Sequence, residues 1–241
     1  MNVLQCYLDD SSATEGAGES VALGGALGTL EGWCRVVAEW EPIIRDSGMG
    51  VFHATEWRGQ EHQLKEHWRQ LIESMNEHLI AYVGCVVPPH AVKTLSGLKV
   101  DRREMTEPND PAPLVHEWAA FESDPLSICL SWCMFYLSDI SRTWGGGQVS
   151  LTFAKTHRLK ARSNRLSAMM NLLERTRNDF GSTTFDGDPR TLVQLQVADL
   201  VAYELTAYRR YEQVRWQFQL LRRKLKRHTA DSPRFANLLA L

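Results

Sequence analysis

Apolar residues recur along this chain with two different periods, and the order of these periods predicts the fold. Short runs that are continuously apolar, or that alternate with polar residues, predict strands at 5–8, 20–27, 80–87, 149–153 and 182–185. Segments with apolar residues three and four positions apart predict helices at 30–46, 60–79, 126–140, 159–177 and 191–211. A hairpin followed by alternating helices and strands indicates an α/β fold, in which one mixed sheet carries helices on both faces.

The length of the chain favours a single domain over residues 1–241. Thr29 is placed to cap the first helix, and residues 51–56 fit a short strand or turn. Between about 98 and 122 the sequence is rich in charge and proline without a clear period, so we expect an irregular excursion there. From about 205 to 241 we expect a basic helical extension, with 213–227 as helix.

The formal net charge of −2 argues against a protein that is basic throughout, but basic residues gather in two stretches. Five Lys or Arg and no acid lie between 155 and 165, and eight Lys or Arg lie between 209 and 227 beside the single acid Glu212. A charge run of this kind is usually a solvated face. The functional alternative is a surface that follows a phosphate backbone, with binding that weakens steeply as salt rises.

The cysteines and the N-terminus bear on the cellular compartment. The five cysteines form no zinc-type spacing, and their odd number and scattered places in apolar runs predict free thiols in a reducing compartment. The N-terminus lacks the pattern of a signal peptide, and the apolar stretches are shorter than the roughly 18 residues needed to cross a membrane. We therefore expect a cytoplasmic protein without membrane contact.

Two acidic segments at opposite ends of the sequence are candidates for a metal site. Asp9 and Asp10 follow the first apolar strand directly, and Asp199 interrupts an apolar helical pattern. If the segments meet, Asp9 and Asp199 would share one Mg²⁺ or Mn²⁺, which proteins often bind through one or two carboxylates. The alternatives are that Asp9 and Asp10 only begin a turn and that Asp199 pairs with an arginine.

The remaining candidate residues are polar or basic side chains that would contact a phosphate or a proton. His53 is a candidate general acid or base, although a single His on a strand is more often an ordinary packed or surface residue. The candidates for contact with nucleic acid are Lys155, Arg158, Gln196, Arg222 and Arg223.

Three short motifs resemble those of the domain-of-unknown-function 3800 family. They are Tyr7-Leu8-Asp9-Asp10-Ser11, Phe52-His53-Ala54-Thr55-Glu56 and Leu195-Gln196-Val197-Ala198-Asp199. The motifs fall in the family's order and span most of the chain, and the third is the most specific. The resemblance implies a ribonuclease H-like fold and a metal-dependent phosphodiesterase, with Asp9 on the central first strand and Asp199 on the last helix as ligands.

One position departs from the pattern that the resemblance implies. A further acid is expected at the end of the strand 149–153, where this chain has Ala154. Loss of that carboxylate would weaken a site with two metal ions. Asp10, Glu56, Asp186 or His157 are alternative donors, and a single-metal or inactive site is the other outcome.

Three hypotheses about function follow from these observations. The first is a Mg²⁺- or Mn²⁺-dependent nuclease that hydrolyses phosphodiester bonds in DNA or RNA. The second is a protein on the same fold that binds nucleic acid without chemistry, motivated by Ala154 and the basic stretches. The third is a scaffold or interaction protein in which the tryptophan-rich helices form an oligomer interface.

Overall fold

The fold is an α/β arrangement built on one mixed sheet. A computed structural model describes residues 3–15, 18–88, 91, 125–145, 147–155, 179–211 and 215–229. The predicted excursion at 98–122, the predicted helix at 159–177, His157 and the candidate Arg158 lie outside the described residues.

In the part of the chain that the structure describes, six strands form the sheet in the order β5-β4-β1-β2-β3-β6. The strands are β1 (Leu4–Glu15), β2 (Gly18–Thr29), β3 (Ala81–Val87), β4 (Val149–Ala154), β5 (Phe180–Gly187) and β6 (Leu225–Thr229). β1, β2 and β3 run antiparallel in succession, whereas β4 is parallel to β1, β5 to β4 and β6 to β3. The prediction of a mixed sheet that begins with a hairpin is confirmed.

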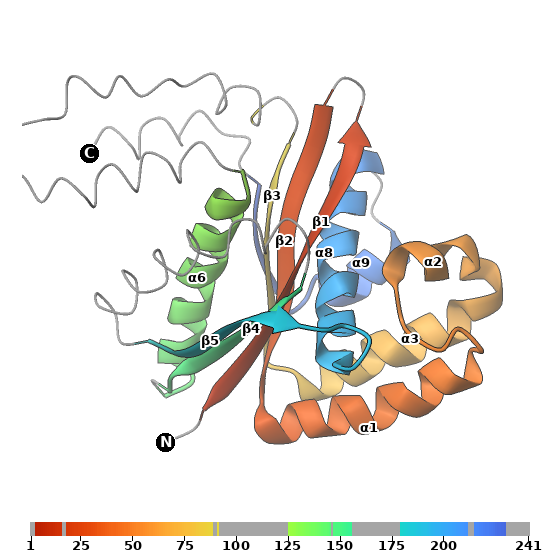
Figure 1. The fold of residues 1–241 in the computed structure, drawn as a ribbon, viewed down its shortest axis with the longest axis horizontal. Coiled ribbons are helices and arrows are strands. Elements are labelled where there is room, and N and C mark those ends of the chain that lie inside the picture. The colour runs from red at the N-terminus through yellow and green to blue at the C-terminus, as the bar shows by residue number, and fades with distance from the viewer. Residues whose placement is uncertain are drawn as a thin grey trace, which may run out of the picture.

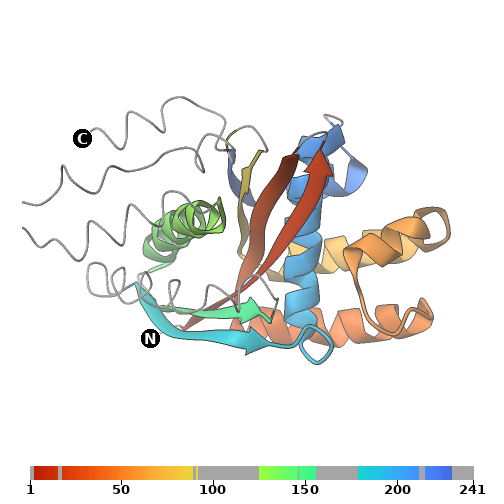
Figure 2. The same ribbon diagram turned by 45° about the horizontal axis from the view of Figure 1, so that its top comes forward.

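Helices cover both faces of the sheet, as predicted (Figure 1). One face packs against α6 (Pro125–Thr143), and α8 (Val193–Tyr211) crosses the other face. Around α8 lie α1 (Leu30–Asp46), α2 (Ala54–Gly59), α3 (Glu61–His78) and α9 (Trp216–Leu221). The turned view in Figure 2 shows the same separation, with α6 on one side of the hairpin and α8 on the other.

The two faces have separate apolar cores. Leu8, Cys6 and Phe153 contribute to the core beneath α6, and a tryptophan cluster fills the core on the α8 side. Trp33, Trp40, Trp57 and Trp68 are all buried there, so the interpretation that the tryptophans of the first helix are core residues is confirmed. Thr29 caps α1 as predicted, because its Oγ1 accepts a hydrogen bond of 3.0 Å from the Gly32 backbone N–H.

Two glycines in the sheet determine how closely α8 approaches. Gly24 on β2 and Gly84 on β3 are partners in the register of the sheet. A Cβ atom on Gly24 would lie 2.6 Å from both the Cα and the N of Ala202, and one on Gly84 would lie 2.1 Å from Leu205 Cδ1. Since backbone atoms cannot move aside as a flexible side chain can, Gly24 fixes the position of α8 over the hairpin.

The C-terminal prediction was wrong in one respect. Residues 213–227 do not form one basic helix, because α9 ends at Leu221 and the chain returns as β6 beside β3. The Lys224 Nζ donates to the backbone carbonyls of Asn76 and Leu79 at the end of α3, which holds the turn before β6 against the body of the domain. Tertiary hydrogen bonding and strand pairing therefore override a pattern that resembled a continuous helix.

Two smaller predictions also differ from the structure. Residues 51–56 do not form a strand, since α2 begins at Ala54 with His53 as its N-cap residue. The strand predicted at 182–185 is longer, spanning Phe180–Gly187, and it is not the last strand, since β6 comes after α8 and α9. Within the described residues, no helix is both long and apolar enough to cross a membrane.

Candidate functional site

Asp9 lies inside β1 at the point where its parallel neighbour stops. The pairing of β1 with β4 ends at Leu8 and Phe153, whereas Asp9 still pairs with Gly24 on β2. The expectation that the acids follow the end of the strand was therefore wrong, because the hairpin extends β1 to Glu15. What ends beside Asp9 is the pairing of β1 with β4.

Asp9 and Asp10 belong to opposite faces of the sheet. Side chains alternate along a strand. Leu8 packs into the core beneath α6, whereas Tyr7 meets Trp33 on the α8 side with ring centroids 4.9 Å apart. Asp9 therefore faces α8 and Asp10 faces the α6 side. The prediction that Asp10 supports the same site as Asp9 is corrected by this alternation.

The close packing of α8 against β2 places Asp199 near Asp9. Ala202 lies directly over Gly24, which pairs with Asp9, and Asp199 is three residues earlier on the same helix. The two carboxyl groups are close enough that the charge of Asp199 raises the pKa of Asp9. The meeting of the two acidic segments, which the sequence left as a condition, is present in the fold.

Each of the two carboxylates has one oxygen bound to the backbone. The Asp10 N–H donates to Asp9 Oδ1 at 2.8 Å, and the Ala54 N–H donates to Asp199 Oδ2 at 2.8 Å. Within the described part of the chain, the second oxygen of each carboxylate accepts no hydrogen bond, and neither group pairs with a Lys or Arg. The alternative in which Asp199 pairs with an arginine therefore finds no support among these residues.

The electrostatics of the pair favour a cation. Burial is the largest cause that raises the pKa of Asp9 well above its usual range, followed by the charges of Asp199 and Asp10. Burial also raises the pKa of Asp199, against which the Ala54 N–H and the charge of His53 act. Two neighbouring carboxylates that both resist ionisation are stabilised when a positive ion lies between them.

The loop before α2 and its first turn bring further polar groups near Asp199. His53 is exposed, and its charge lowers the pKa of Asp199, whereas the charge of Glu56 raises it. The Asp199–Ala54 hydrogen bond fixes the start of α2, so His53 and Glu56 come from an element anchored on the candidate site. Of the alternative donors that the structure describes, Glu56 is the one whose charge raises the pKa of Asp199.

Ala154 faces the same side of the sheet as Asp9. Val149, Leu151 and Phe153 pack into the core beneath α6, so Ala154 points to the α8 side by alternation. It follows Phe153, the partner of Leu8, and is fully buried. The expected third acid would thus lie next to Asp9, and a methyl group occupies that position. Asp186 is exposed on β5, two strands away from β1.

Gln196 is not available as a contact to nucleic acid. Its side chain is buried, its Oε1 accepts from the Phe52 N–H at 2.9 Å, and its Nε2 donates to the Pro189 carbonyl at 2.8 Å. The amide therefore joins two loops to α8, one of which leads to His53. This corrects the sequence prediction and gives Gln196 a positioning role behind the site.

The basic candidates lie at different distances from the acid pair. Lys155 is exposed directly after Ala154, and its N–H donates to the Gly187 carbonyl at 2.7 Å. Arg222 and Arg223 are exposed in the turn before β6, which is separated from β1 by β2 and β3. Lys155 is therefore a neighbour of the candidate site, whereas the two arginines are at the far edge of the sheet.

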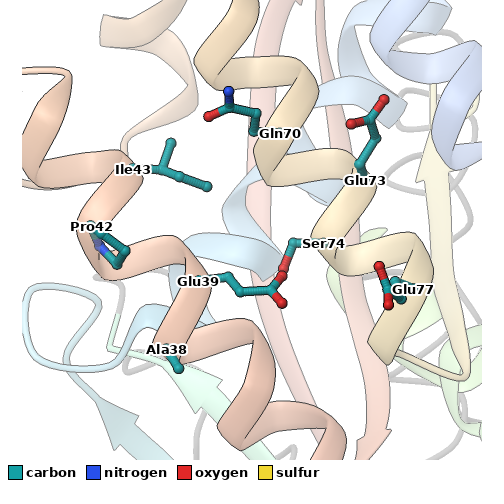
Figure 3. A pocket seen from close by; sticks show the side chains of 8 residues that line it. All are labelled: Ala38, Glu39, Pro42, Ile43, Gln70, Glu73, Ser74 and Glu77. Carbon is teal, nitrogen blue, oxygen red and sulfur yellow. The ribbon is translucent and has the colours of Figure 1, made fainter.

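The candidate site is not enlarged by any other cluster of metal-binding side chains or by the groove that the described residues form. No group of three or more His, Cys, Asp or Glu side chains among them is arranged to hold a metal ion. A groove of about 470 Å³ lies between α1 and α3, lined by residues that include Glu39, Glu73 and Glu77 (Figure 3). None of its lining residues belongs to β1, β4 or α8, so the groove is separate from the acid pair.

Comparison of the chain with protein-family models, with curated proteins and with solved structures found no match. Function is therefore inferred from the geometry of Asp9 and Asp199. Sequence reasoning missed two contributors to this geometry, Gly24 and the Ala54 N–H. The adjacent glycines Gly24 and Gly25 inside an apolar strand were a usable signal, because glycine within a strand often marks a close backbone approach.

Proposed function

We propose that this protein is a Mg²⁺- or Mn²⁺-dependent phosphodiesterase that acts on nucleic acid. The observation that carries the proposal is the pairing of Asp9 and Asp199, each with one oxygen bound to a backbone N–H and the other without a hydrogen bond from the described residues. The ribonuclease H-like fold belongs to the same proposal. It is supported by a mixed sheet in which β1, an inner strand, carries Asp9.

The donor set fits a hard divalent cation. Two carboxylates with one open oxygen each match the way Mg²⁺ is usually held, with water and substrate phosphate as the remaining ligands. Such an ion supplies Lewis acidity and activates water for attack on phosphorus. The raised pKa values of both aspartates, caused first by burial, are also those of groups that gain from a nearby cation.

The protein's own groups have distinct roles in this proposal. Asp9 and Asp199 present one oxygen each, and their backbone hydrogen bonds hold the carboxylate planes in place. His53 lies near Asp199 on an exposed loop, where it can take or give a proton at a phosphate oxygen. Lys155 follows β4 beside the acid pair and is suited to a phosphate of the substrate backbone.

A second candidate is a nucleic-acid-binding protein that lacks turnover, and Ala154 favours it. A carboxylate at this position would adjoin Asp9, so its replacement by a methyl group removes a donor from the site. Under this proposal, nucleic acid binds through basic residues and the binding persists after removal of divalent metal. The two candidates make different predictions for the same set of variants.

The first test is a thermal-unfolding titration with Mn²⁺ on wild type, Asp9→Asn, Asp199→Asn and Asp10→Asn. A ligand that binds only the folded state stabilises it by about 2.7 kcal/mol at 100 times its dissociation constant. We expect this stabilisation for wild type and for Asp10→Asn, whose side chain faces away from the site. We expect its loss in Asp9→Asn and in Asp199→Asn.

Cleavage assays on single- and double-stranded DNA and RNA then separate the two candidates. Turnover with Mn²⁺ that both site variants abolish supports the phosphodiesterase. Salt-sensitive binding without turnover, together with cleavage gained by Ala154→Asp, supports the second candidate. Absence of Mn²⁺ stabilisation in wild type, with no turnover on any substrate, would contradict the metal-dependent proposal.

A further inference from the structure

A second group of buried charges lies on α8, five residues beyond Asp199. Glu204 is fully buried, and one of its oxygens lies 3.3 Å from Nη1 of Arg215, the residue that precedes α9. Arg215 also donates through Nη2 to Glu61 at the start of α3, at 3.3 Å. Glu204, Arg215 and Glu61 therefore join α8, α9 and α3 in one cluster.

The residues after Arg215 strengthen the same junction. Trp216 donates through Nε1 to Glu61 Oε1 at 3.0 Å, and Gln217 donates through Nε2 to the same oxygen at 2.8 Å. The guanidinium of Arg215 lies 5.6 Å from the ring centroid of Tyr203. The polar contacts of residues 215–217 with the body of the domain thus converge on Glu61 and Glu204, and the buried side chains of Phe218 and Leu221 add apolar contacts.

The hydrogen bonding of this cluster is incomplete on the Glu204 side. Both carboxylate oxygens of Glu204, Nη1 of Arg215 and Oε1 of Gln217 are buried without a hydrogen-bond partner among the described residues. These are three acceptors and one donor. If Glu204 binds a proton, one acceptor becomes a donor, and the four atoms become two donors and two acceptors.

The surroundings of Glu204 bring its protonated and ionised forms to similar free energies near neutral pH. Burial raises the pKa of Glu204 to about 7, the charges of Arg215 and Arg58 oppose this rise, and the charge of Glu61 adds to it. A carboxylate buried without hydrogen bonds is costly even beside a cation, because an ion pair does not replace the lost water. Any opening that lets water reach Glu204 removes this cost.

We propose that Glu204 is the proton-binding group of a latch that holds the segment 215–221 against α8 and α3, closed when Glu204 is protonated and loosened when it is ionised. The latch is independent of the proposed metal site, since none of its groups contacts Asp9 or Asp199. It governs the docking of α9 and of the turn with Arg222 and Arg223 that follows.

The test is amide hydrogen exchange of the full chain as a function of pH, without metal or nucleic acid. Suitable probes are the Gln219 and Arg222 amides, which donate within the segment to Arg215 and Phe218. Opening that exposes Glu204 releases one proton between pH 4.5 and about 7, where the open and closed states differ in charge. After correction for intrinsic exchange, the opening constant should rise about tenfold per pH unit, roughly 300-fold in total, and level off above pH 7.

The matched variant is Glu204→Gln, which keeps the shape of the protonated side chain. Its opening constant should stay low and lose this slope, while amides within α1 should lack the slope in both proteins. The same slope in Glu204→Gln, or none in wild type, would overturn the proposal. If the variant does not fold, a carbon-13 titration of the wild-type carboxyl groups tests the proposal instead. The absence of any Glu carboxyl that titrates above its ordinary range would also refute the latch.

Discussion

Asp199 and Glu204 lie five residues apart on α8, and the protein surrounds their charges in opposite ways. Among the residues that the structure describes, Glu204 has a cation, Arg215, but no hydrogen bond to either oxygen. Asp199 has a hydrogen bond from the Ala54 N–H and a second carboxylate nearby, with no Lys or Arg paired to it among the described residues. One arrangement completes a junction between helices, whereas the other brings negative charges together.

The difference indicates which acid belongs to a junction between helices and which is arranged to bind a cation. An acid that stabilises a fold is normally paired with a positive group of the same chain, because removal from water is costly. Two neighbouring acids without such a group lower stability until a cation arrives. The predictions below test this contrast.

The largest effect on stability is expected at Arg215. Replacement by Met should lower the free energy of unfolding by about 3–5 kcal/mol, because it leaves Glu204 and Glu61 without their shared cation. Denaturant unfolding at pH 8 measures the change. Arg35→Met is the matched control, since its pair with Glu31 is exposed and should contribute no more than about 1 kcal/mol. Equal effects of the two changes would show that the buried cluster contributes no more to the free energy of unfolding than an exposed ion pair.

A smaller effect on stability is expected at Gly24, the glycine against which α8 packs. Gly24→Ala places a Cβ 2.6 Å from the Ala202 backbone, so α8 must shift, at a cost of about 1–3 kcal/mol. The shift should also abolish the stabilisation by Mn²⁺, because Asp199 moves with the helix. Gly59→Ala, whose Cβ would meet no atom within 4 Å, should leave the response to Mn²⁺ unchanged. A Gly24→Ala protein that keeps the full response would refute the positioning role.

The smallest effect has the opposite sign and concerns Asp9. Its raised pKa means that the folded state binds the proton more tightly than the unfolded state, so ionisation costs stability as pH rises above the ordinary value of 3.8. Asp9→Asn should therefore raise the free energy of unfolding at pH 8 without metal, by about 0.5–2 kcal/mol. Asp10→Asn should raise it less, because the charge of Asp10 is a smaller cause of the raised pKa of Asp9 than burial and the charge of Asp199. Destabilisation by Asp9→Asn would indicate that Asp9 is a structural residue.

Much of the fold was predictable because local periodicity is a direct consequence of burial. The hairpin, α1, α3, β3 and α6 follow patterns in which apolar positions repeat with the period of the element, and the Thr29 cap is a local interaction. The prediction failed at 213–227, where α9 ends and β6 begins. That boundary depends on pairing with β3 and on Lys224 bonds to α3, which are about 145 residues away in the sequence.

The candidate site was predictable in its members but not in its geometry. Asp9 and Asp199 were identifiable as acids beside apolar patterns, and Ala154 as a place where an acid was expected. The opposite orientation of Asp10 required knowing that β1 continues to Glu15 as a strand. Gln196 was misassigned because its partners, Phe52 and Pro189, are brought to it only by the packing of two loops.

By itself, the sequence determined the alternation of strands and helices, the two-faced burial of the sheet and the presence of two isolated acidic segments. These properties depend on each residue's affinity for water and on neighbours within a few positions. Only the tertiary structure decided that Asp199 lies beside Asp9 and that Glu204 pairs with Arg215. The first outcome depends on the register of the sheet and on the closeness of α8 to Gly24, which are set by contacts between residues far apart in the chain. The second depends on the packing of the residue before α9 against α8.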